Sequence, residues 1–110
     1  MRSFLYKISN ILRPYPYIDF LVRKINKDTL VEALMLEEQE FDGKIRHAEQ
    51  FYENRLQDKD WTDFLSKLHS NSELFFFKYP IEYWMKSQGR QGYVIIENDK
   101  IIAAIITRMN

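Results

Sequence analysis

Two apolar runs near the C-terminus constrain the fold of this chain more than any other feature. They cover residues 93–96 and 101–107, are rich in β-branched side chains, and are separated by Glu-Asn-Asp-Lys at 97–100. β-branched runs favour strands, and an Asn-Asp pair tolerates the positive φ of a two-residue hairpin turn. We therefore predict an antiparallel β-hairpin. The second run is apolar at consecutive positions, so both of its faces need cover: helices on one side, and a third strand, more helix or a partner chain on the other.

The rest of the chain is predicted to be mostly helical, because its apolar residues recur at spacings of three and four. The candidate helices cover 2–12, about 17–25, 29–57, 60–69 and 80–87. In the first, the side chains expected to pack inward are Phe4, Ile8 and Leu12. A glycine at position 43 interrupts the longest helix, which is expected to bend or break there.

The segment 70–79 allows two predictions. Ser70-Asn71-Ser72-Glu73 matches a helix capping box, whereas Leu74-Phe75-Phe76-Phe77 is a short apolar run that suits a buried strand. We favour a helix and keep a third strand near 73–79 as the alternative. The predicted fold class is a mostly helical α+β single domain, 1–110, with a C-terminal antiparallel hairpin.

The longest predicted helix, 29–57, has an apolar face and an acidic face. Its spacing predicts that Phe41 and Ile45 point toward the core and that Glu37 and Glu40 point largely outward. The acids of this helix form a candidate binding surface, made of Glu37, Glu38, Glu40, Asp42, Glu49 and Glu53. An acidic surface favours a partner with basic groups.

Charge is unevenly distributed, although the net charge is zero. Residues 1–27 hold six bases and one acid, whereas residues 28–63 hold eleven acids and four bases. The favoured interpretation is that the two segments pack together and neutralise each other. The alternative is that the basic segment 1–27 binds a membrane surface or nucleic acid.

The sequence does not point to a particular chemistry. Cysteine is absent, which removes thiolate catalysis and every cysteine-based metal site. His47 shares a helix face with Glu40, but the Glu-x-x-His pairs of carboxylate metal sites do not occur. The chain also lacks a Gly-x-Ser-x-Gly turn and a phosphate-binding glycine loop. We predict no catalytic residue, metal or cofactor, and keep an enzyme with an unrecognised carboxylate and histidine site as a further alternative.

The leading functional prediction is a small, non-enzymatic binding or regulatory protein that docks onto another macromolecule, namely a protein. Its contact surfaces would be the acidic helix face and the segment 79–90, where the candidate residues are Tyr79, Tyr83, Trp84 and Arg90. Aromatic residues and arginine are favoured at protein interfaces, and we expect these three aromatic side chains to be partly exposed. A homo-oligomer through the hairpin is a second arrangement. The chain shows no membrane span or signal peptide, and a cytoplasmic location is expected.

Overall fold

The computed structural model describes residues 4–6 and 17–110 of the chain. These residues form a five-stranded antiparallel sheet with helices packed against it. The strand order is β1-β5-β4-β3-β2, so the last two strands lie inside the sheet and the first two lie at its edges. The strand bounds are Phe4–Tyr6 (β1), Leu21–Ile25 (β2), Glu73–Lys78 (β3), Arg90–Glu97 (β4) and Lys100–Met109 (β5). β1 pairs with residues 104–106 of β5, so this part of the hairpin edge is occupied within the chain.

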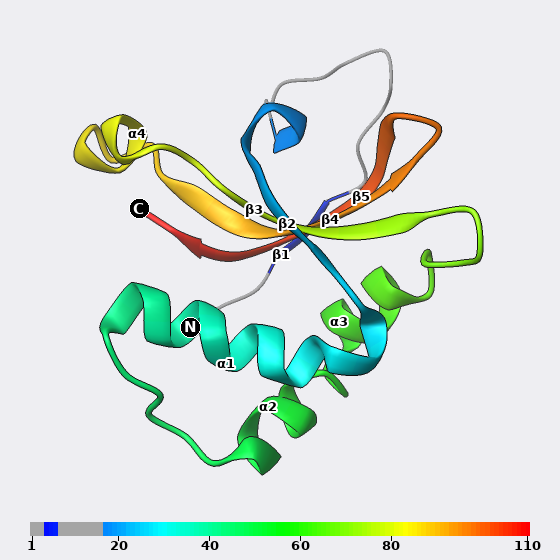
Figure 1. Cartoon of the computed structure of the whole chain (residues 1–110), viewed down its shortest axis with the longest axis horizontal. Helices are drawn as coiled ribbons and strands as arrows, with labels where there is room; N and C mark the ends of the chain where they lie inside the picture. The colour runs from blue at the N-terminus through cyan, green and yellow to red at the C-terminus, as the bar shows by residue number, and fades with distance from the viewer. Residues whose placement is uncertain (1–3, 7–16) are drawn as a thin grey trace.

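Helices cover both faces of the sheet (Figure 1). One face carries α1 (Leu30–Asp42), α2 (Glu49–Arg55) and α3 (Lys59–Leu65). The other face carries α4 (Ile81–Met85) and a 3₁₀ turn, η1 (Tyr17–Phe20). A second 3₁₀ turn, η2 (Lys27–Thr29), leads from β2 into α1, and the Asn26 side chain caps it by accepting a hydrogen bond from the Asp28 N–H.

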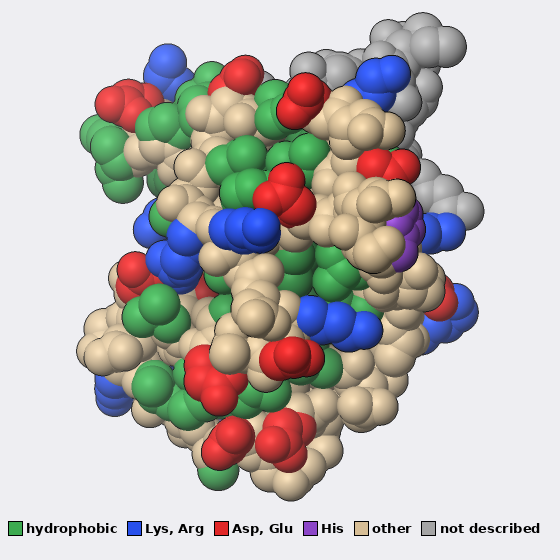
Figure 2. Space-filling model, turned by 45° about the vertical axis from the view of Figure 1, so that its right-hand side comes forward, with side chains coloured by type: hydrophobic (Ala, Val, Ile, Leu, Met, Phe, Trp, Pro, Cys, Tyr) green, Lys and Arg blue, Asp and Glu red, His purple; other side chains and the backbone are tan. Residues whose placement is uncertain are grey.

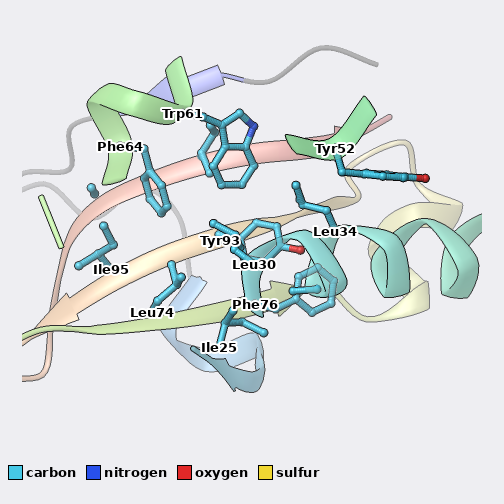
Figure 3. Packing of buried hydrophobic residues seen from close by; sticks show 13 residues of the cluster. Ile25, Leu30, Leu34, Tyr52, Trp61, Phe64, Leu74, Phe76, Tyr93 and Ile95 are labelled. Atoms are coloured by element: carbon cyan, nitrogen blue, oxygen red, sulfur yellow. The ribbon is translucent and has the colours of Figure 1, made fainter. Parts of the chain in front are cut away.

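The larger core lies between the sheet and α1–α3 (Figure 3). Trp61 and Phe64 of α3 are fully buried and meet edge to face at 5.7 Å. The Trp61 ring also contacts the ring of Tyr93 on β4 at 5.5 Å. Large aromatic side chains bury the most apolar area, so these contacts hold α3 against the middle of the sheet.

A second core lies on the opposite face, under η1 and α4. Tyr17 of η1 stacks on Phe77 of β3 with ring centroids 4.4 Å apart. Val94 of β4 and Ala104 and Ile106 of β5 are fully buried on this side. Both faces of β5 are therefore covered within the chain, as its continuous apolar run requires.

The structure corrects several of the helix predictions. Among residues 4–6 and 17–110, strands contain as many residues as α-helices, so this part of the chain is α+β but not mostly helical. Residues 17–25 form η1 and then β2, and 73–78 form a strand, which was the alternative prediction for that segment. Within the predicted helix 2–12, residues 4–6 form β1, and the rest lies outside the described residues. The short apolar repeat of 17–25 fits both periods, and pairing with β3 selects the strand.

The long predicted helix is broken, and its buried face differs from the prediction. Gly43 ends α1 with a left-handed φ of +82°, and α2 begins only at Glu49. Glu37 is 3% exposed, whereas Phe41 and Ile45 are 43% and 42% exposed. Phe41 lies in the last turn of α1, beyond the main core, and Ile45 follows the helix end, so helical periodicity does not apply to it.

The hairpin turn is confirmed, and it supports a first testable expectation. Asn98 and Asp99 have φ values of 52° and 63°, and Glu97 pairs with Lys100 across the turn. Two consecutive positive φ values define a type I′ turn, which glycine adopts freely. We expect Asp99→Gly to leave the free energy of unfolding unchanged or to raise it by up to ~1 kcal/mol, and Asp99→Ala to lower it by ~1 kcal/mol. Urea unfolding of the two variants measures both values, and a loss of stability in the glycine variant would contradict this turn type.

Candidate functional site

A β-bulge near the end of the hairpin directs the side chains of two neighbouring β5 residues, Thr107 and Arg108, toward α1. Gln91 pairs with Arg108 and Gly92 pairs with Ile106, which leaves Thr107 as the extra residue on β5. The Thr107 hydroxyl donates to the carboxylate of Glu37, and the Arg108 guanidinium lies 3.5 Å from the Asp42 carboxylate. Both acids belong to α1. A regular strand would send neighbouring side chains to opposite faces, so the bulge creates this polar contact between sheet and helix.

Glu37 is buried at the centre of this contact. One carboxylate oxygen accepts hydrogen bonds from the Gln91 side-chain amide at 2.7 Å and from the Thr107 hydroxyl, and the other accepts from the Tyr93 hydroxyl at 3.1 Å. Burial, followed by the negative charge and hydrogen bond of Glu37, raises the pKa of Tyr93 well above its ordinary value. Three donors directed at one carboxylate satisfy a buried acceptor that would otherwise be costly.

Glu38 is buried beside it and faces α2. The Tyr52 hydroxyl donates to the Glu38 carboxylate, and His47 Nε2 lies 4.0 Å from the other oxygen of that carboxylate. Burial, together with the hydrogen bond to Glu38, raises the pKa of Tyr52 to about 12. The His47 ring stacks on the ring of Phe51 at 3.9 Å. The loop after Gly43 thus returns a histidine to the side of α1 that carries Glu38.

Glu38, His47 and Phe51 border an open pocket of about 230 Å³. Its lining consists of Glu38, Asp42, His47, Phe51, Arg55 and Arg108. Burial lowers the pKa of the Arg55 guanidinium, and the positive charge of Arg108 adds to this effect against the opposing influence of Glu37 and Asp58. The Arg108 guanidinium lies over the Phe41 ring, 4.2 Å from its centroid, which is a cation–π contact. The pocket therefore combines two acids, two arginines, a histidine and an aromatic wall.

The structure divides the predicted acidic surface. Glu37 and Glu38 are buried and cannot belong to an exposed binding face, because their position on α1 points them at the sheet and at α2. Glu40 is exposed and pairs with Arg23 of β2 at 2.8 Å, and Asp42 borders the pocket. The two acids on α2 that remain exposed are Glu49 and Glu53.

The predicted aromatic surface is also only partly exposed. Tyr79 is buried, and its ring lies against those of Phe20 and Tyr83 at 5.0 Å. Tyr83, Trp84 and Arg90 are half-buried around α4. The expected exposure is therefore wrong for Tyr79, because η1 and α4 enclose it.

Sequence reasoning missed the residues that complete the site: Gln91, Thr107, Arg55 and Arg108. The available signal was the presence of Gln91 and Thr107 beside strongly apolar strand residues, since buried polar residues are more informative than buried apolar ones. Within the described residues, no cluster of three or more His, Asp or Glu side chains is arranged to hold a metal ion. None of the helices in the described part of the chain is long and apolar enough to span a membrane.

The pocket lining carries groups of both charges, and its Glu38 carboxylate and His47 Nε2 lie 4.0 Å apart. Its lining contains no serine or threonine, so the described residues there do not provide a hydroxyl nucleophile. Comparison with protein family models, curated proteins and solved structures found no match for the chain.

Proposed function

We propose that this protein is a non-enzymatic binding protein that docks onto another protein through the surface of α4. The observation that carries the proposal is the exposure of two large aliphatic side chains on this helix, 66% for Ile81 and 80% for Met85. Residues four apart lie on the same side of a helix. Met109, at the end of β5, is a further exposed apolar side chain. We call Ile81, Met85 and Met109 the α4 surface.

The inner side of α4 is fixed, so its outer side is presented on a rigid support. The Trp84 indole N–H donates to the Tyr79 carbonyl at 3.0 Å, and the Asn110 side-chain amide donates to the Trp84 carbonyl at 2.8 Å. The Tyr83 ring packs on Phe20 at 5.6 Å. A preorganised surface loses less conformational entropy on binding, and methionine is enriched where proteins meet.

Charge near α4 is mixed, so the apolar side chains carry the proposal. Glu82 is an exposed acid on α4 and Lys86 directly after the helix is an exposed base, whereas the exposed acids Glu49 and Glu53 belong to α2 on the opposite face of the sheet. On the face shown in Figure 2, acidic and basic side chains are interspersed with hydrophobic ones, with no large region of one sign. Such a surface guides orientation and partner choice more than it attracts a polyanion.

The described part of the basic segment 1–27 gives less support to the alternative function, which is binding of a membrane surface or nucleic acid. Arg23 pairs with Glu40 at 2.8 Å and Lys24 pairs with Glu73 at 2.8 Å. Both cations thus have an acidic partner within the chain, and the Arg23–Glu40 pair joins the basic segment to the acidic segment 28–63. Membrane or nucleic-acid binding through segment 1–27 is retained as an outcome of the test below.

The test compares partner affinity in matched variants. Proteins captured from the native host would be identified and purified, and the dissociation constant of each would then be measured with the intact chain. The double variant Ile81→Ser/Met85→Ser should raise the dissociation constant of the true partner by about tenfold or more, because truncating central apolar contacts costs more than ~1 kcal/mol. Val22→Ser, which alters an apolar side chain of comparable exposure on β2, should leave the affinity unchanged.

Three results would contradict the proposal. One is an unchanged dissociation constant for the double variant. Another is capture that disappears after nuclease treatment. The third is binding to anionic vesicles with the same affinity in both variants. The second and third results would favour nucleic-acid or membrane binding through segment 1–27. Both variants should keep the wild-type melting temperature within a few degrees, since exposed substitutions rarely change stability by more than ~0.5 kcal/mol.

A further inference from the structure

The pocket beside α1 has a spare hydrogen-bond donor on Arg108, whereas its acids already have partners. Glu38 accepts from Tyr52 and faces His47. Asp42 lies 3.6 Å from the Arg46 guanidinium and 3.5 Å from that of Arg108. A ligand that fits this arrangement must supply acceptors, because the pocket carboxylates are already engaged.

The geometry around Arg108 shows this unused donor capacity. Its Nε atom is buried and makes no hydrogen bond to any residue that the structure describes. Its distance of 3.5 Å from Asp42 exceeds the ~2.7–2.9 Å of a direct charge-assisted hydrogen bond. Its side chain is only 16% exposed, and the Phe41 ring supports its guanidinium plane from one side. The group is therefore held in place without a strong acceptor.

Arg55 brings a second guanidinium to the same pocket. The negative charges of Glu37 and Asp58 act on Arg55 more strongly than the positive charge of Arg108, so Arg55 contributes to the pocket by its place in the lining. The planar fork of arginine matches the oxygen atoms of carboxylates and phosphates. The stacked His47 and Phe51 rings form the more exposed wall and leave the pocket open to solvent.

We propose that this pocket binds a small oxyanion, a carboxylate or phosphate group, through Arg108, with Arg55 beside it in the lining. A volume of about 230 Å³ corresponds to roughly eight water molecules at ~30 Å³ each, which suits inorganic phosphate or a short carboxylic acid. The proposal is independent of docking at the α4 surface, because it rests on different residues.

Titration calorimetry of the intact chain with inorganic phosphate and with acetate, at constant ionic strength, tests the proposal. We expect saturable binding of one anion per chain for at least one of the two. Arg108→Gln should weaken it by about tenfold or more, since it removes a charged donor. Arg46→Gln is the matched control, because Arg46 contacts the same Asp42 carboxylate but does not line the pocket, and it should change the affinity by less than about twofold.

Arg108→Lys keeps the result interpretable if Arg108→Gln does not fold. Lysine retains the positive charge but lacks the planar fork, so binding should weaken several-fold while the melting temperature stays near that of the wild type. Binding of phosphate alone, or of acetate alone, supports the proposal and identifies the anion. Absence of saturable binding for both anions, or equal weakening in Arg46→Gln and Arg108→Gln, would overturn it.

Discussion

Replacing Gly92 with alanine is expected to lower the free energy of unfolding by ~3 kcal/mol or more. A Cβ atom at this position would lie 2.0 Å from the Ile105 carbonyl oxygen and 3.0 Å from the Ile105 carbonyl carbon and the Ile106 Cα. All three are backbone atoms of the paired strand, so no side-chain rotation removes the overlap. Overpacking in a well-packed interior usually costs ~1–3 kcal/mol, and a clash with backbone belongs at the upper end or beyond.

Gly43→Ala provides the control for this substitution. Nothing lies within 4 Å of the added Cβ there, and only the positive φ of +82° opposes it, for ~1 kcal/mol. Chemical denaturation should therefore give a much lower free energy of unfolding for Gly92→Ala than for Gly43→Ala. Similar stabilities for the two would mean that the strands do not approach each other at the bulge as the structure shows.

Removing the buried carboxylate of Glu37 is expected to have a comparably large effect. Glu37→Ala leaves the side-chain N–H of Gln91 and the hydroxyls of Tyr93 and Thr107 without their acceptor. An unsatisfied buried donor costs ~1–3 kcal/mol, and the cavity adds to that cost, so we expect a loss of ~3–5 kcal/mol. This replaces the expectation from periodicity alone, in which an outward Glu37 would contribute little.

Glu40→Ala is the matched control on the same helix, one turn later. Its exposed ion pair with Arg23 should contribute less than ~1 kcal/mol. Thermal or urea unfolding, followed by circular dichroism, measures both differences. If the two variants lose equal, small amounts of stability, the contacts of Glu37 do not contribute as proposed.

Local sequence signals predicted the features that depend on neighbouring residues. The Asn98-Asp99 turn, the strands on either side of it and the helix end at Gly43 each follow from a few consecutive residues. The need to cover both faces of β5 followed from a single apolar run. These features are reliable because β-branching, turn chemistry and glycine conformation act locally.

Features that depend on distant residues were not predictable in the same way. The segment 21–25 becomes a strand because it pairs with residues 74–77, about fifty positions later. The three donors to Glu37 lie 54, 56 and 70 positions from it in the sequence. Glu37 lies seven residues after Leu30 and three after Leu34, on the side of α1 that the structure buries, so the prediction that it points outward is wrong. Its three hydrogen-bond donors become visible only in the folded sheet.

The strand order has a consequence for how the protein forms during biosynthesis. The first two strands lie at the two edges of the sheet, and the hairpin that separates them comes last in the described chain. β1 pairs with β5, and β2 pairs with β3, which in turn needs β4. A growing chain can therefore not complete its sheet until residues 90–109 have left the ribosome. We expect the apolar face of α1 to lack the β4 and β5 part of its core until then, which makes nascent chains ending before the hairpin candidates for chaperone binding.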